Sequence, residues 1–170
     1  MRMHQLLASV VLAFALFSGA PPQAAEPPAP AVRAVGPQDF EQILAAERGN
    51  LVVVNLWATW CAPCLVEIPD LMRLEKDLAA LKVKLIGLAV DEPRGGVAPI
   101  EAMRQRYFPA FNTYARDKTE LDHLISVIDP AWNEVVPTTY VIGRDGKVKT
   151  RIQGKKSLDE FKAAVTAAAQ

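Results

Sequence analysis

The sequence predicts an α/β domain whose central sheet carries an antiparallel pair of strands at one edge. Two apolar runs rich in β-branched residues, at 51–57 and 83–90, have the composition of central strands buried on both faces. Segments with helical spacing alternate with these runs, which is typical of a sheet with parallel strands. Near the C-terminus, strand-like runs at 138–142 and 148–152 flank an Asp-Gly turn and predict a hairpin.

The helices are predicted from apolar spacing and from capping residues. Asp39 with Gln42, and Ser157 with Glu160, have the spacing of a capping box at a helix start. Thr119 is a third candidate cap. Helices are expected over residues 39–48, 61–81, 99–107, 119–127 and the segment after 157, with a Gly/Pro loop at 91–97 and a short strand at 111–115.

The N-terminal segment is predicted to lie outside the fold. Residues 1–25 combine a weakly basic start, a short apolar run and small residues after it, as secretory signals do. The run is shorter than the roughly 20 residues of a spanning helix, yet no good cleavage site follows it. Residues 5–20 are therefore either part of a removed signal or an uncleaved membrane anchor. The Pro/Ala-rich residues 26–37 are expected to form a linker, and residues 38–170 the folded domain.

The composition excludes several classes of function. Nineteen basic and nineteen acidic residues give a formal net charge of zero, so we expect no nucleic-acid partner. A hydrophobic content of 51% excludes an intrinsically disordered chain. The two histidines, His4 and His123, leave little room for a histidine-based metal site.

Both cysteines, Cys61 and Cys64, stand at the predicted start of a helix that directly follows a buried strand. Unpaired backbone N–H groups and the helix dipole stabilise a thiolate on Cys61 at that place. Cys64 lies one turn further in, on the same side and more buried. We therefore expect a redox-active disulfide in which Cys61 is the nucleophile and Cys64 the resolving thiol, acting through a mixed disulfide.

Other uses of two cysteines at this spacing fit less well. A structural zinc site needs four ligands, and the sequence has no second pair. A haem-attachment motif needs histidine directly after the second cysteine, where this sequence has Leu65. A purely structural disulfide would close too short a loop to stabilise the fold much.

Several stretches together resemble a known family: WATWCAPC after LVVVNL, then Glu67 and Pro69, and the tetrapeptide VPTT at 136–139 before a strand. They resemble the thioredoxin superfamily, and more closely the TlpA/ResA/CcmG-like thiol–disulfide reductases of the bacterial cell envelope. The resemblance covers about residue 38 to the C-terminus. It implies a thioredoxin fold with a central αβ insertion between residues 90 and 119, and a cis Val136–Pro137 bond beside the disulfide.

The resemblance also implies a substrate groove around Pro137. A fixed turn there would expose backbone groups beside Cys61 that can pair with an extended substrate chain. Substrate contacts are expected from Trp60 beside the first cysteine, and from Val136, Thr138 and Trp132 around the turn. Trp60 is also expected to shield the disulfide from water, and ordinary packing is the alternative role for Trp132.

Glu67 is the candidate proton shuttle for Cys64. The strand before the motif carries Asn55 where ordinary thioredoxins have a buried aspartate, and an asparagine cannot take up a proton. Glu67 follows Cys64 by three residues on roughly the same helix face and matches a glutamate of the ResA-like branch. A carboxylate partly buried beside a thiol should have a raised pKa. The alternative is that Glu67 faces solvent and only favours the helix dipole.

The expected function is reduction of disulfides in exported proteins, in the periplasm or at the outer face of the cytoplasmic membrane. The uncharged Ala62-Pro63 pair between the cysteines predicts low to moderate oxidising power. The resemblance implies substrates such as apocytochrome c, in cytochrome c biogenesis, or metal-site cysteines. It also implies a membrane thiol carrier as electron donor, and no cofactor.

Two rival functions remain. A peroxiredoxin-type thiol peroxidase would carry Thr or Ser three residues before the reactive cysteine, where this sequence has Ala58. A non-enzymatic Cu(I) carrier would use the two thiols as soft ligands.

Overall fold

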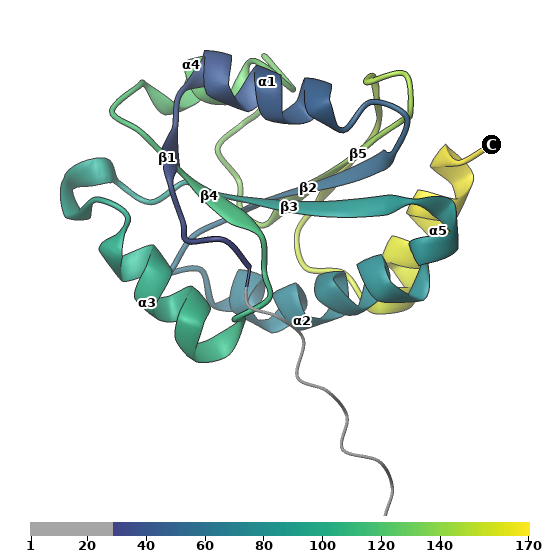
Figure 1. The fold of residues 1–170 in the computed structure, drawn as a ribbon, viewed down its shortest axis with the longest axis horizontal. Helices are drawn as coiled ribbons and strands as arrows, with labels where there is room; N and C mark the ends of the chain where they lie inside the picture. Colours follow the sequence, from purple (N-terminus) through teal and green to yellow (C-terminus); the bar gives the residue numbers. More distant parts are fainter. Residues whose placement is uncertain (1–28) are drawn as a thin grey trace, which may run out of the picture.

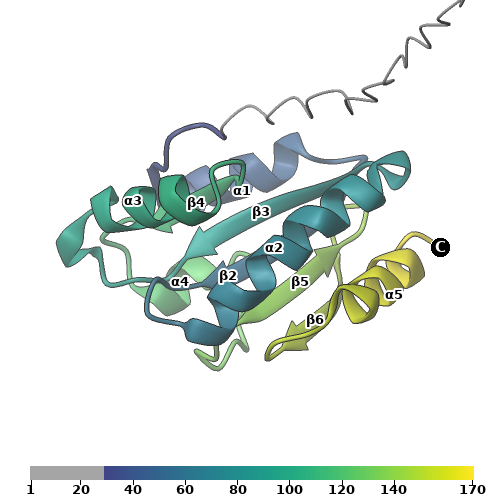
Figure 2. The same ribbon diagram turned by 90° about the horizontal axis from the view of Figure 1, so that it is seen from below.

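The computed structural model describes residues 29–170, which form a six-stranded mixed sheet covered by helices on both faces (Figures 1 and 2). The signal or anchor predicted for residues 1–25 lies outside the described residues. The strand order across the sheet is β1-β4-β3-β2-β5-β6. The strands are β1 (Ala34–Val35), β2 (Leu51–Trp57), β3 (Val83–Ala89), β4 (Thr113–Arg116), β5 (Thr138–Ile142) and β6 (Val148–Gln153).

The helices form two layers. On one face of the sheet lie α1 (Pro37–Ala46) and α4 (Leu121–Ile125), at the top of Figure 1. On the other face lie α2 (Ala62–Asp77), α3 (Ala98–Tyr107) and α5 (Leu158–Ala168), with α2 and α5 side by side. Two 3₁₀ turns, η1 (Ala79–Leu81) and η2 (Pro93–Gly95), complete the set. No helix among residues 29–170 is both long and apolar enough to cross a membrane.

The predicted α/β architecture with an antiparallel pair at one edge is confirmed. Strands β1, β4, β3 and β2 run parallel, whereas β5 and β6 are antiparallel to their neighbours. All seven residues of β2 are buried, as its apolar composition predicts for a central strand. In the register of β2 with β5, Leu56 lies opposite Thr138. The end of β2 and the start of β5 therefore meet at one end of the sheet.

The α2 helix is held on the sheet by one apolar face. Ile68, Leu71 and Leu74 on that face are fully buried, as are Phe161 and Val165 of the neighbouring α5. Complete burial of a side chain of this size stabilises the fold by about 1.5–3 kcal/mol. This packing fixes the helix whose first turn carries the cysteine pair.

Two of the three predicted helix caps are wrong. The first helix begins at Pro37 rather than at Asp39, and the Asp39 carboxylate accepts a hydrogen bond from the N–H of Gly36 at 3.4 Å. A proline is favoured at the first position of a helix because its missing N–H would have no partner there anyway. Thr119 does not cap α4, which starts at Leu121. The N–H of Thr119 instead donates to Asp117 at 2.7 Å, so this residue belongs to the preceding turn.

The third cap is confirmed, and one predicted helix is shorter than expected. The capping box of Ser157 and Glu160 is confirmed, with the serine N–H donating to the glutamate at 2.9 Å. The helix predicted over 61–81 ends at Asp77 and is followed by the separate turn η1.

The sequence did not predict β1, which lies within the segment expected to be a linker. Val32 and Val35 are buried, and Ala34 and Val35 pair in parallel with β4. The Val32 N–H donates to Glu101 of α3 at 2.9 Å. We infer that the folded domain starts by Val32, upstream of the expected residue 38.

Candidate active site

The cysteine pair forms a disulfide at the start of α2. Cys61 is the N-cap residue of the helix in extended conformation, and its Cα lies 5.3 Å from that of Cys64. The Cys61 Sγ accepts a hydrogen bond from the N–H of Cys64 at 3.3 Å. Cys61 is 4% exposed and Cys64 is 0% exposed, so of the two cysteines only Cys61 reaches the surface. A thiolate on Cys61 would gain this N–H and the positive end of the helix dipole.

Asp91 holds the loop that precedes Cys61. Its carboxylate accepts the backbone N–H of Thr59 at 3.1 and 3.2 Å and also accepts the Thr59 hydroxyl. The buried Arg116 of β4 in turn donates its Nε–H to the Asp91 carbonyl at 3.0 Å and forms an ion pair with Glu92 at 2.9 Å. The segment between β3 and β4 is thereby connected to the loop that precedes Cys61.

Sequence reasoning missed this role of Asp91, which was assigned only to a Gly/Pro loop. The sequence does contain an indication of this contact. Asp91 follows β3, which pairs in parallel with β2, so it lies at the same end of the sheet as the cysteine motif that follows β2. The side chain that would meet it, Thr59, is 32 residues away along the chain.

The two tryptophans of the motif have different surroundings. Trp57 is fully buried, and its indole N–H donates to the Thr113 hydroxyl at 2.9 Å, so it is a packing residue. Trp60, directly before Cys61, is 69% exposed. It presents a large apolar surface beside the disulfide.

Glu67 is fully buried, so the alternative that it faces solvent is wrong. Its Oε1 accepts from the side-chain amide of Asn55 at 3.0 Å, and its Oε2 accepts from the N–H of Lys156 at 3.3 Å. Burial raises its pKa to about 7, and these two hydrogen bonds and the charge of Lys155 only partly oppose the rise. The carboxyl can therefore exchange a proton near neutral pH.

Asn55 is a buried support for this carboxyl. Its Nδ2 also donates to the Thr139 hydroxyl at 3.0 Å, so the amide bridges α2 and β5. Its Oδ1 has no hydrogen-bond partner among the described residues. An asparagine with both amide hydrogens engaged keeps a fixed orientation toward Glu67.

The loop before β5 lies at the same end of the sheet as the disulfide. The Val136–Pro137 peptide bond is cis, as the family resemblance implied. The indole N–H of Trp132 donates to the Val135 carbonyl at 3.3 Å and to the Thr138 hydroxyl at 3.4 Å. Thr138 is buried and donates its hydroxyl to the same Val135 carbonyl at 2.7 Å. Trp132 and Thr138 therefore brace this loop from within.

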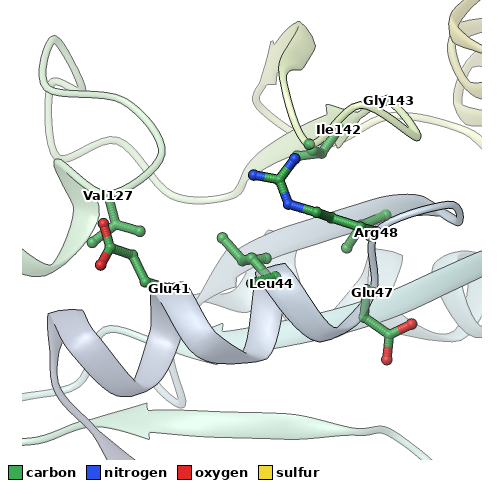
Figure 3. A pocket seen from close by; sticks show the side chains of 10 residues that line it. Glu41, Leu44, Glu47, Arg48, Val127, Ile142 and Gly143 are labelled. Carbon is green, nitrogen blue, oxygen red and sulfur yellow. The ribbon is translucent and has the colours of Figure 1, made fainter.

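A cavity of about 190 Å³ between α1 and the β5–β6 hairpin plays no part in this site (Figure 3). Leu44, Val127 and Ile142 line it, and the Arg48 guanidinium crosses it to donate to the Asp145 carbonyl at 2.9 Å. It adjoins Val52 near the start of β2, five residues before the strand's end. At 3.3 Å per residue that is roughly 17 Å along the strand from the disulfide end. Among residues 29–170, no three His, Cys, Asp or Glu side chains gather as metal ligands would.

Comparisons with known proteins agree with this geometry. The sequence model described as "AhpC/TSA family" matches residues 27–151. The chain is 30% identical over 122 residues to the thiol-disulfide oxidoreductase ResA of Geobacillus thermodenitrificans, covering 72% of this chain and 65% of that protein. It is 32% identical over 123 residues to ResA of Bacillus thuringiensis subsp. konkukian, covering 70% and 65%.

A solved structure is similar over a larger share of both chains. It is a thiol:disulfide interchange protein of the thioredoxin family from Chlorobium tepidum, with a TM-score of 0.63 and 25% identity over 87% of this chain and 99% of that one. The thioredoxin-like fold is therefore confirmed. The matched region spans 65% of the length of the two ResA relatives.

Proposed function

The chain belongs to the AhpC/TSA family of thioredoxin-like proteins, and from this premise we propose that it is an exported thiol–disulfide oxidoreductase that reduces disulfides in other exported proteins. The observation that carries the proposal is the Cys61–Cys64 disulfide at the start of α2, in which Cys64 is completely buried and Cys61 keeps 4% of its surface accessible. A cysteine at a helix N-terminus with a buried partner one turn later has the geometry for exchange through a mixed disulfide.

In the reduced chain, Cys61 is the attacking thiolate. It attacks one sulfur of the substrate disulfide, forms a mixed disulfide and releases the other substrate sulfur as a thiolate. Cys64 then attacks the Cys61 sulfur, which re-forms the internal disulfide and releases the second substrate thiolate. Two electrons pass to the substrate, and the two protons of the cysteine thiols end on the substrate sulfurs.

Glu67 is the proposed base for the second step. Cys64 must lose its proton before it attacks, and its burial disfavours a lone thiolate. Glu67 is one helical turn further along α2 and has a pKa of about 7, so near neutral pH a substantial fraction is ionised and able to take that proton. Asn55 holds the carboxyl in place.

A substrate chain is proposed to lie across the loop at Val136 and Pro137. Trp60 and Val135 offer exposed apolar surface there, and Val136 is partly exposed. Trp132 acts at this surface by bracing the loop, and Thr138 contributes through the same bracing because its side chain is buried. Contacts of this kind accept an extended segment around a cysteine, as in apocytochrome c or an exported metal-site protein.

Location and electron supply complete the proposal. We place the domain outside the cytoplasmic membrane, with residues 5–20 as signal or anchor, and assign reduction of its disulfide to a membrane-bound dithiol. The uncharged Ala62-Pro63 pair adds no side-chain charge that would stabilise a Cys61 thiolate further, which keeps the expected oxidising power low to moderate.

The reduction potential of the Cys61–Cys64 couple tests the proposal. The full chain is equilibrated in defined thiol buffers, and the fraction of disulfide is measured after acid quenching and thiol labelling. A value near −270 mV, that of thioredoxin, supports a reductant, whereas a value near −120 mV, that of a strong disulfide donor, overturns the assignment. A Cys64→Ser variant should accumulate the mixed disulfide, and a Cys61→Ser variant should not.

Two further measurements separate the rivals. Peroxide turnover that depends on Cys61 would favour a thiol peroxidase, although the only hydroxyl near the expected position, that of Thr59, is bound to Asp91. A Cu(I) titration in which the reduced chain outcompetes a strong chelator would favour a metal carrier.

A further inference from the structure

The segment between α4 and β5, residues 126–137, carries the proposed substrate surface yet belongs to no helix or strand. It includes Trp132 and the cis Val136–Pro137 bond. Glu134 in this 126–137 loop has a φ of 60°, a left-handed conformation that is unfavourable for residues other than glycine. A loop with such a backbone keeps its shape only when contacts with the rest of the structure hold it there.

The start of the loop is held by the carboxylate of Asp129. Its Oδ2 accepts hydrogen bonds from the Tyr140 hydroxyl at 3.0 Å and from the Arg151 Nη1 at 2.9 Å. Its Oδ1 accepts the N–H of Ala131 at 2.9 Å, and Arg151 also donates to the Ala131 carbonyl at 3.3 Å. Hydrogen bonds with a charged partner are stronger than neutral ones. Asp129 therefore ties the loop firmly to both strands of the β5–β6 hairpin.

The hairpin presents these donors on one face. Tyr140 and Arg151 are direct neighbours in the register of β5 with β6, so their side chains leave the same face of the sheet. Gln153, two residues further along β6, belongs to that face as well. Its side-chain amide donates to the Asn133 side chain. β6 thus holds the loop at two points, immediately before the residues proposed to face a substrate.

The charges of this network suit a permanent anchor. Burial alone would raise the pKa of Asp129, but the hydrogen bonds that its carboxylate accepts, first among them that of Arg151, hold it below its usual value. Burial and the neighbouring carboxylate raise the pKa of Tyr140, so its hydroxyl keeps the proton that it donates. An ionised carboxylate therefore faces a guanidinium and an intact hydroxyl at neutral pH.

The network is set back from the cysteine pair. β5 begins at Thr138, opposite Leu56 near the end of β2 that leads to the cysteines, and Tyr140 follows two residues later. At about 3.4 Å per residue, this is roughly 7 Å along the strand. A change at Asp129 or Arg151 should thus alter the shape of the loop without altering the chemistry of the disulfide.

We propose that Asp129 is a positioning residue for polypeptide substrates, which together with Tyr140 and Arg151 holds the 126–137 loop in the shape that receives an extended chain. This inference rests on the proposed function, because it takes the loop to be the substrate surface. A loop that is already ordered loses less conformational entropy when a partner binds. The benefit applies to a chain long enough to lie across the loop, and not to a small disulfide that reaches only Cys61. The network therefore favours polypeptide disulfides over small ones.

Single-turnover reduction of two disulfides by the reduced chain tests this. One is a synthetic peptide with a Cys-Ala-Ala-Cys disulfide in its middle, and the other is hydroxyethyl disulfide; acid quenching and thiol labelling follow both reactions. Arg151→Met should lower the rate constant for the peptide by about fivefold, while the rate constant for hydroxyethyl disulfide and the reduction potential stay unchanged. Asp129→Asn, which replaces an acceptor oxygen with a donor, should have the same effect.

Two variants of β6 make the test specific. Arg151→Lys keeps the charge and a donor toward Asp129, so it should retain most of the rate with the peptide. Lys149→Met is the matched control, because Lys149 is 41% exposed against 37% for Arg151 and also lies 2.9 Å from an aspartate, Asp145, which is outside the loop. It should change neither rate constant. Hydrogen–deuterium exchange in residues 126–137 should be faster in Arg151→Met than in this control.

The outcomes separate this inference from the proposed function. Tyr140→Phe removes only a hydroxyl and should change the rates in the same direction as Arg151→Met, so the test does not depend on the folding of one variant. An unchanged ratio of the two rate constants in both variants would overturn the inference and leave the proposed function intact. Equal losses with both disulfides, or a shifted reduction potential, would overturn it in the same way. A wild-type chain that failed to reduce the peptide would overturn the proposed function, and this inference with it.

Discussion

Replacing Glu67 with glutamine removes one ionisable group from the interior at nearly constant volume. Burial raises the pKa of this carboxyl from 4.5 to about 7 in the folded chain. The folded state therefore binds the proton more tightly than the unfolded chain does. The contribution of Glu67 to the free energy of unfolding is fully present below pH 4.5 and is lost as the pH rises through the folded pKa. The reason is that the interior disfavours the charged form, whereas water around the unfolded chain does not.

The expected size follows from the same values. Between pH 4.5 and pH 8, ionisation of Glu67 lowers the free energy of unfolding by about 3 kcal/mol. The glutamine side chain has one acceptor oxygen, so it can keep the bond from Asn55 or the bond from Lys156 but not both. That loss costs about 1 kcal/mol at every pH. The wild-type chain should be more stable by about 1 kcal/mol at pH 4.5, and Glu67→Gln more stable by about 2 kcal/mol at pH 8.

Urea unfolding of the oxidised chain at pH 4.5, 6 and 8 measures the crossover. With the Cys61–Cys64 disulfide intact, neither cysteine titrates, so the comparison isolates the carboxyl. The exposed Glu41→Gln serves as the matched control and should differ from wild type by a small, nearly constant amount. A difference between wild type and Glu67→Gln that is the same at all three pH values would refute the burial argument. In the reduced chain, an unchanged pH profile of thiol reactivity in this variant would refute the shuttle role.

Substitutions at three further positions test other parts of the site and fold. Asp91→Ala removes the acceptor that holds the loop before Cys61 and should lower the free energy of unfolding by about 2 kcal/mol. Asp91→Asn should lower it by less. Urea unfolding measures both variants, and equal losses would contradict the role of the hydrogen bonds. Trp132→Phe keeps an aromatic side chain but loses the N–H that donates to the Val135 carbonyl. The value of kcat/KM for a disulfide substrate should therefore fall, while the reduction potential stays unchanged. A shifted potential would mean that Trp132 acts on the cysteine pair itself. Ser157→Ala should cost about 1 kcal/mol with faster amide exchange in the first turn of α5, and unchanged exchange there would show that the cap contributes nothing.

The elements that the sequence predicted best are those with a strong local signal. The bounds of β2 and β5 match the predicted runs, because an apolar, β-branched run bounded by a sharp turn or a helix cap leaves few alternatives. The cysteine pair lies at a helix start for the same local reason. For Glu67 the sequence allowed either a partly buried or a solvent-facing side chain. The structure shows burial, which depends on the segments that pack against that face of α2.

The remaining features depend on residues that are far apart in sequence. β1 has only two residues and therefore no periodicity, and it exists because β4 offers a free edge. The contact of Asp91 with Thr59 joins two loops whose own sequences do not show that they meet. The start of α1 was misplaced because Asp39 fits either the cap or the third helical position, and Pro37 decides between them.

The two outer strands of the sheet have a consequence for how the protein behaves at high concentration. An open edge offers unpaired N–H and C=O groups on which another chain can add a strand, the first step of edge-to-edge aggregation. On one side, β1 is too short to act as such a template. On the other side, β6 carries Lys149 and Arg151, and its pairing with β5 is interrupted by an irregularity at Val141 and Ile142. Charge and irregular pairing both oppose the addition of a further strand, so the sheet is protected against growth at both ends.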